Sequence, residues 1–115
     1  MLVATLVLRS AWHLVAGSLD VLLQAAPEGL DVAAVEADLA SLPGVAAAGH
    51  LHAWTLADRS AVATAHVVPE PGADPLALPA LVAARLRERH RIAHATVQVD
   101  PPSGAAPACF AETAP

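Results

Sequence analysis

The residues best suited to chemistry in this chain of 115 residues are its six histidines. Four of them lie in stretches with β-strand character, and an aspartate closes the last of these stretches. The five residues are His50, His52, His66, His94 and Asp100. Imidazole and carboxylate groups are ligands of transition metals, and three imidazoles with one carboxylate suit a tetrahedral Zn²⁺ site. The same ligands also accept Co²⁺, Ni²⁺ and Cu²⁺, so the sequence leaves the metal open.

Strand alternation predicts that these five side chains share one face of a sheet, because residues two apart in a strand point the same way. His50 and His52 therefore share a face of the first strand. His66 in the strand Ala61 to Val68, and both ends of the strand His94 to Asp100, fall on the matching side. A second interpretation stays open, because an open sheet face also tolerates half-exposed histidines that bind nothing. Spacing alone does not separate the two.

The helical and strand patterns that position these residues predict an α+β domain with the order α-β-β-α-β, preceded by another helix. Helices are expected at about Val3–Gln24, Val32–Leu42 and Leu76–Arg91, and strands at about Val45–Leu56, Ala61–Val68 and His94–Asp100. Asp31 is the expected N-cap of the second helix, and Pro43-Gly44 ends it. Two helices then cover one face of a three-stranded sheet and leave the histidine face open.

The open face also carries apolar side chains, namely Trp54, Val62 and Val68. Monomers seldom leave large apolar patches bare, so we predict a homodimer. The isolated histidines His13 and His90, both in expected helices, are interpreted as structural or solvent-facing rather than as ligands.

Composition excludes several classes of function. The net charge of −5 argues against nucleic acid as a partner, because such binding needs a positive footprint. Four of the six basic residues, all arginines, alternate from Arg85 to Arg91 and are interpreted as a solvated helix face. The sequence has no nucleophile elbow, no paired-carboxylate pattern and no glycine-rich phosphate loop, so we do not expect an enzyme.

The two ends of the chain differ from its middle. From Leu2 to Leu23 the sequence is nearly continuously apolar, but only Met1 to Leu8 is free of charge, which is too short to cross a bilayer. This segment is either the cytoplasmic end of a spanning helix whose beginning is missing or an amphipathic helix that docks on a surface.

The single cysteine, Cys109, cannot form an internal disulfide. We expect three parts: helix and linker in 1–26, one domain in 27–101 and a disordered tail in 102–115.

Five ordered blocks between about Leu8 and Pro101 resemble the C-terminal domain of cation diffusion facilitators, and the zinc-exporting branch most of all. The blocks read Asp-Val-Leu-Leu-Gln-Ala-Ala-Pro-Glu-Gly from Asp20, Leu-Pro-Gly-Val from Leu42, His-Leu-His-Ala-Trp-Thr-Leu from His50, Ala-His-Val-Val from Ala65 and His-Ala-Thr-Val-Gln-Val-Asp from His94. The resemblance implies a metallochaperone-like, ferredoxin-like domain that dimerises on the cytoplasmic side of a six-helix membrane transporter. Val3 to Leu19 would then correspond to the end of the last membrane helix.

The resemblance also implies a set of metal ligands, carried over residue by residue. The set is His52, His66, His94 and Asp100, all of which strand alternation places on the open face. Two positions depart from the family pattern. Gly49-His50 stands where many relatives have His-Asp or His-His, and Asp100 stands where many have glutamate. Whether His50 or Cys109 adds a ligand is left open.

The function expected from this resemblance is a regulatory metal-binding and dimerisation domain of an exporter of zinc or a similar divalent cation. It would act at the cytoplasmic face of the cell membrane. One alternative is a metal-free dimerisation or interaction module. Another is a stand-alone soluble metal-binding protein.

Overall fold

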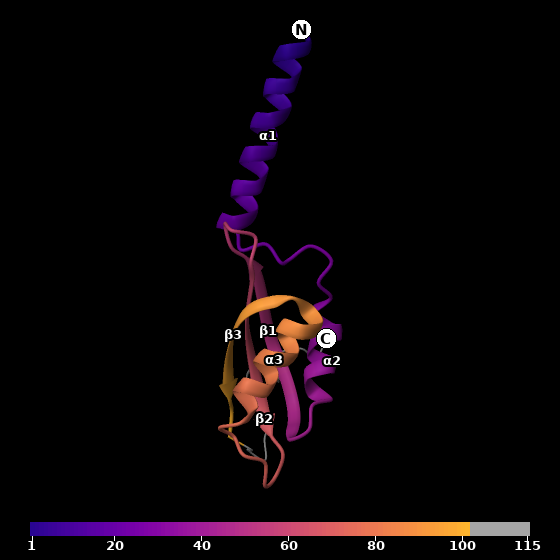
Figure 1. The fold of residues 1–115 in the computed structure, drawn as a ribbon, viewed down its shortest axis with the longest axis vertical. Coiled ribbons are helices and arrows are strands. Elements are labelled where there is room, and N and C mark those ends of the chain that lie inside the picture. The colour runs from indigo at the N-terminus through magenta and orange to yellow at the C-terminus, as the bar shows by residue number, and fades with distance from the viewer. Residues whose placement is uncertain (102–115) are drawn as a thin grey trace, which may run out of the picture.

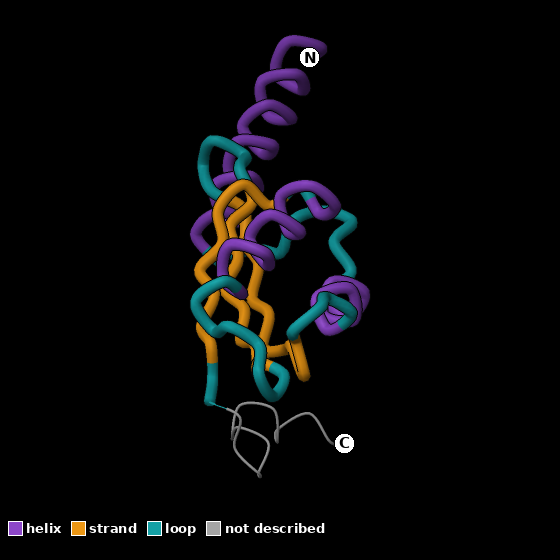
Figure 2. Tube along the Cα trace, turned by 60° about the horizontal axis from the view of Figure 1, so that its bottom comes forward, coloured by secondary structure: helices purple, strands orange, loops and turns teal. Residues whose placement is uncertain are grey.

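The computed structural model describes residues 1–101 and has six elements in the order expected from the sequence. Helix α1, Leu2–Leu22, projects away from a small α+β unit that contains all the others, as Figures 1 and 2 both show. The predicted tail, with Cys109, lies outside the described residues. The order helix, then α-β-β-α-β, confirms the expected fold class.

The sheet has three strands in the order β1-β2-β3, which are Val45–Thr55, Ala61–Pro69 and Ile92–Val99. Strands β1 and β2 form an antiparallel hairpin, whereas β2 and β3 run parallel. Parallel neighbours need a crossover connection, and helix α3, Leu78–His90, supplies it. The hairpin turn falls at the predicted place, where the Ser60 backbone N–H donates to the Asp58 carboxylate at 2.9 Å.

Helix α2, Val32–Ala40, begins at the predicted cap, since the Asp31 side chain accepts from the Ala34 N–H at 3.2 Å. Helices α2 and α3 pack on the same side of the sheet and enclose one core. The core consists of Val35, Leu39, Leu42, Val45, Leu51, Ala63, Ala65, Val67, Leu78, Val82, Leu86 and Ile92. Alanines in the central strand allow the helices to lie close to the sheet. The opposite face of the sheet carries no helix in residues 1–101.

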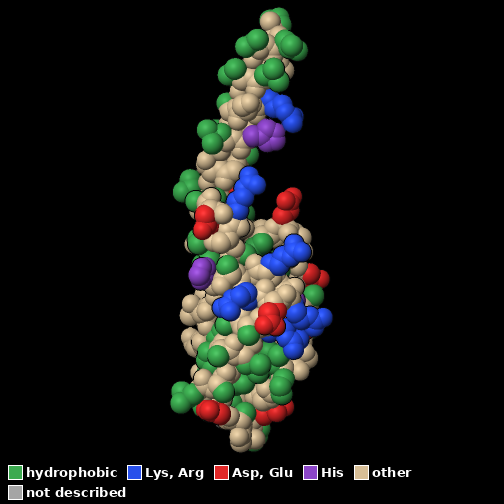
Figure 3. Space-filling model, in the orientation of Figure 1, with side chains coloured by type: hydrophobic (Ala, Val, Ile, Leu, Met, Phe, Trp, Pro, Cys, Tyr) green, Lys and Arg blue, Asp and Glu red, His purple; other side chains and the backbone are tan. Residues whose placement is uncertain are grey.

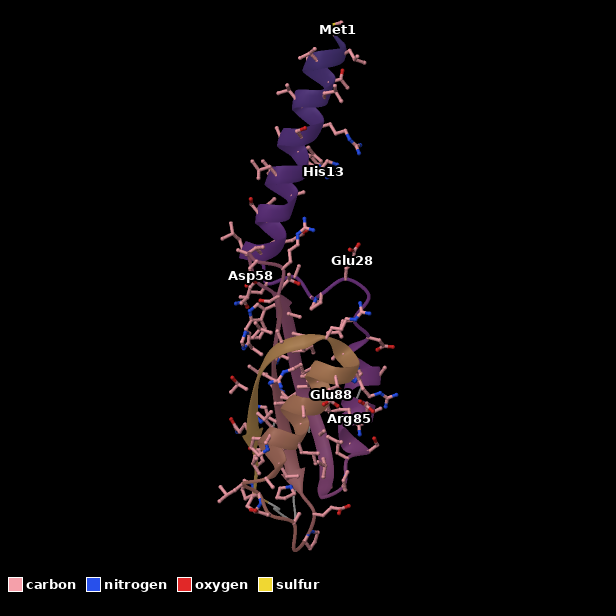
Figure 4. The ribbon with its side chains drawn as sticks, in the orientation of Figure 1. Met1, His13, Glu28, Asp58, Arg85 and Glu88 are labelled. Atoms are coloured by element: carbon pink, nitrogen blue, oxygen red, sulfur yellow. The ribbon has the colours of Figure 1, made fainter. Side chains whose placement is uncertain are left out.

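The two helices are also tied to each other through Asp38. Its carboxylate accepts from Arg85 at 2.8 Å, from Arg89 at 3.0 Å and from His90 at 2.8 Å. The hydrogen bond from His90, followed by the charges of Arg85 and Arg89, lowers the pKa of Asp38. Figure 4 shows Arg85 at the side of the α+β unit where α2 and α3 meet. His90 is therefore structural, as predicted, while two of the four clustered arginines are ion-paired rather than only solvated.

Helix α1 has no buried residue, and only Ala16 and Val21 along it are partly covered. By length and composition alone α1 could cross a membrane, which corrects the expectation from the short charge-free run Met1 to Leu8. Figure 3 shows apolar side chains along it. The segment that follows α1 rests on the hairpin end of the sheet, where the Thr55 N–H donates to the Ala25 carbonyl at 3.3 Å. Figure 4 accordingly shows Asp58, in the hairpin turn, beside the lower end of α1.

Candidate metal centre

The open face of the sheet contains the histidines, in the alternation that the sequence predicted. In β2 the buried residues Ala63, Ala65 and Val67 alternate with the half-buried Thr64 and His66. In β1 the core residue Leu51 separates two exposed histidines, His50 and His52.

A β-bulge in β1 sets the positions of these two histidines. Gly49 is opposite His66 and His52 is opposite Thr64, so β1 has one residue more than β2 across this interval. The extra residue bends the strand locally. His50 takes up this bend with a φ of +53°, a left-handed conformation that is uncommon outside glycine.

The bulge places the His50 ring between two other imidazoles. Its centroid is 4.7 Å from that of His52 and 5.1 Å from that of His66, and both pairs meet edge to face. Three imidazoles from two adjacent strands thus lie in one group on the open face. We call His50, His52, His66 and Asp100 the histidine cluster.

Asp100 joins the cluster from the end of β3. Its Oδ2 is 3.0 Å from Nδ1 of His66, and its Oδ1 accepts from the Gln98 side-chain amide at 2.8 Å. The Asp100 backbone N–H donates to the Val67 carbonyl at 2.8 Å, which extends the β2–β3 pairing by one residue. Asp100 is only 8% exposed. A carboxylate fixed at both oxygens holds the His66 ring in one orientation.

His94 lies at the other end of the open face. It is opposite Val62, whereas His66 is opposite Gln98, so four residues separate the two histidines along the parallel pair. That offset is about 13 Å at the rise of a strand. His94 lies nearer the hairpin turn, where the hydrogen bonds from Ser60 are the main cause of the lowered pKa of Asp58 and His94 contributes least.

The structure therefore brings together part of the predicted ligand set. His66 and Asp100 are in contact, His52 reaches the group through His50, and His94 is apart from it within one chain. His50, which the sequence left open as a ligand, is central to the cluster. Among residues 1–101, no three histidine, cysteine or acidic side chains already stand in the geometry of a metal site. Binding would require the exposed rings of His50 and His52 to turn from one staggered rotamer to another.

Comparison with known proteins agrees with the resemblance seen in the sequence. Residues 27–102 match the family described as cation efflux protein, cytoplasmic domain. The chain belongs to this family, which is defined by a transporter domain rather than by a catalytic activity.

Two curated relatives illustrate the similarity. The zinc transporter ZitB of Escherichia coli is 37% identical over 100 residues, which cover 86% of this chain and 32% of ZitB. The cation efflux system protein CzcD of Alcaligenes sp. strain CT14 is 36% identical over 101 residues, with the same coverage of 86% and 32%. The chain thus spans about a third of the length of the curated relatives it matches.

Among solved structures, the metal-bound C-terminal domain of the CzcD transporter from Cupriavidus metallidurans has the same fold. The TM-score is 0.56 at 30% sequence identity, and the match covers 62% of this chain and 99% of that domain. This likeness confirms the metallochaperone-like α+β class.

Proposed function

We propose that this chain is the metal-sensing and dimer-forming cytoplasmic domain of an exporter of zinc or a similar divalent cation. The observation that carries the proposal is the histidine cluster: three imidazoles and the buried carboxylate of Asp100 gather on the one sheet face that α2 and α3 leave open. The metal-bound state of the CzcD domain supports it by similarity.

The donor groups fit a borderline transition metal such as Zn²⁺, because imidazole nitrogen and carboxylate oxygen are its ordinary protein ligands. We propose His66 and Asp100 as the centre of the site, since they already meet at 3.0 Å. His50 and His52 are the adjacent ligands. The sequence predicts His94 as a further ligand, but we place it outside the proposed site, because the position opposite Val62 separates it from the others in one chain. Bound metal would supply positive charge and fixed coordination that draw these side chains together.

Dimerisation is proposed for the same open face. Trp54, Val62 and Val68 are all half-buried there in the single chain. Covering them with a second copy removes apolar surface from water, which is the main driving force of association. Helix α1 would connect this dimer to the membrane part of the exporter, because it is exposed and apolar enough to cross a bilayer. A cation moved by that membrane part would be its substrate, distinct from the ion bound here.

Zinc titration by calorimetry, combined with light scattering, tests the proposal. Both use the whole chain in detergent micelles, because α1 is exposed and apolar. We expect saturable zinc binding and a dimer. A dimer that takes up no zinc, Co²⁺, Ni²⁺ or Cu²⁺ would favour the interaction module, and a monomer under all conditions would contradict the dimerisation role.

A further inference from the structure

The β-bulge that shapes the histidine cluster is held from the opposite side of the sheet. The Leu51 N–H, which belongs to the peptide unit joining His50 to Leu51, donates to Oε1 of Glu36 at 2.9 Å. Glu36 lies on α2, the helix that packs against β1 on the covered face. The acceptor for this bulge N–H is therefore a side chain 15 residues earlier in the sequence rather than a neighbouring strand.

This hydrogen bond has a specific consequence for His50. Orienting the peptide plane after His50 fixes the rotation on one side of its α-carbon, and the left-handed φ of +53° fixes the other. A non-glycine residue keeps such a conformation only when its surroundings enforce it. Leu51 is 5% exposed, so its N–H cannot turn to water as a substitute partner. Glu36 is the group that satisfies this N–H.

We propose that Glu36 is a positioning residue of the metal centre, acting through the bulge to keep the His50 ring beside His52 and His66. The proposal rests on the metal-binding function inferred above. Glu36 does not approach the metal, because the sheet backbone lies between α2 and the open face. It links the helix layer to the cluster through one hydrogen bond. A shift of α2 would consequently change the position of the His50 ring.

A purely structural role for Glu36 makes different predictions from a positioning role. Glu36→Ala removes the acceptor, whereas Glu36→Gln keeps an oxygen that can accept from Leu51. Asp31→Ala is the matched control, because it deletes a hydrogen bond from the same helix, at its N-cap, and leaves the bulge intact. If Glu36 only stabilised α2, Glu36→Ala and Asp31→Ala would behave alike.

The first measurement needs no metal. Amide hydrogen exchange by NMR on the full chain in micelles should show Leu51 exchanging faster in Glu36→Ala, at the parent rate in Glu36→Gln, and at the parent rate in Asp31→Ala. The ring proton shifts of His50 should move only in Glu36→Ala. Unchanged Leu51 exchange and His50 shifts in Glu36→Ala would overturn the proposal, whatever the chain binds.

The second measurement is the zinc dissociation constant, obtained by competition with a chelating indicator. Residues that orient a metal ligand typically contribute ten- to a hundredfold to affinity, so we expect about tenfold weaker binding in Glu36→Ala. Glu36→Gln and Asp31→Ala should stay within about twofold of the parent.

His50→Ala is the reference for this titration. Loss of affinity in His50→Ala without loss in Glu36→Ala would overturn the positioning role and leave the metal site standing. Parent protein that binds no zinc would refute the metal-binding function, and with it the proposed role of Glu36 in a metal centre. The exchange data would then show only whether Glu36 holds the bulge.

Discussion

At the scale of single residues, the pairing of His66 with Asp100 is the best-defined feature of the open face. Asp100 is 8% exposed, and its carboxylate is held by Gln98 as well as by His66. Taking an anion this far out of water is unfavourable unless hydrogen bonds or a cation compensate for it. A bound divalent metal would compensate much more strongly than a single hydrogen bond to an imidazole does. This is why we place the centre of the site at these two residues.

Because His94 is separated from His66, we expect the ligands predicted from the sequence to differ in their effect on zinc affinity. His94→Ala should change zinc affinity less than about twofold, because His94 lies about 13 Å along the strand from the cluster. Asp100→Asn, which keeps the shape but removes the charge, should weaken zinc binding by at least about tenfold, in the range for loss of a key metal contact. Competition titrations of both variants measure this. Equal losses would restore His94 to the ligand set.

At the scale of elements, α2 serves both the core and the site. Val35 and Leu39 face the sheet and are fully buried, while Glu36 reaches the bulge in β1 and Asp38 reaches α3. Side chains four apart on a helix share a face, as Val35 and Leu39 do, whereas successive side chains point about 100° apart. One short helix can therefore make all these contacts. The position of α2 against the sheet is thus specified by polar as well as apolar groups.

The contacts of Asp38 with Arg85, Arg89 and His90 predict how the free energy of unfolding depends on pH. Because its pKa is lowered in the folded state, the stabilisation is present above the unfolded value of 3.8 and is lost as pH falls through the lower folded value. Asp38→Asn should lower the free energy of unfolding by about 1 kcal/mol at neutral pH, since these pairs are partly exposed to solvent. The difference from the parent should shrink below the unfolded pKa. Urea melts at several pH values would show this.

Glu88→Gln is the control for this pH series, because it removes an exposed carboxylate from α3. Its stability should follow the parent at every pH. A difference between parent and Asp38→Asn that persists unchanged into acid would contradict the assigned role of the Asp38 carboxylate.

Much of the element order could be predicted from the sequence because it depends on local signals. The Asp31 cap, the Pro43-Gly44 stop and the period of two in the strands are local, and they correctly placed the histidines on one face. The position of a residue relative to the neighbouring strand is not set by local signals. The register of β3 on β2, which separates His94 from His66, depends on how the α3 crossover packs. The bulge at His50 depends on Glu36, a contact between distant positions.

At the scale of the whole molecule, the two ends of the sheet have different neighbours. The hairpin end touches the segment that follows α1, through Thr55 and Ala25. The histidine cluster lies farther along the same two strands. If α1 continues into a membrane, a change in how two copies meet at the cluster would be transmitted along rigid strands to the base of α1. A ligand shifts such an equilibrium only by the difference in its affinity for the two arrangements.

Zinc should therefore favour the dimer as well as the fold. Binding to the folded state alone raises the free energy of unfolding by about 2.7 kcal/mol when free zinc is a hundred times its dissociation constant. The dimer dissociation constant, measured by analytical ultracentrifugation in micelles, should fall when zinc is added. A dimer constant that zinc leaves unchanged would show that metal binding and assembly are independent.

The most direct test of the central claim is the zinc-induced rise in melting temperature of His66→Ala compared with the parent. His66 contacts both Asp100 and the His50 ring, and its side chain is only half-buried, so alanine should remove the centre of the site while the sheet still forms. His13→Ala, on the exposed helix α1, is the control. We expect the parent and His13→Ala to melt higher with zinc, and His66→Ala to lose most of that rise. A folded His66→Ala variant that zinc stabilises as fully as the parent would contradict the site.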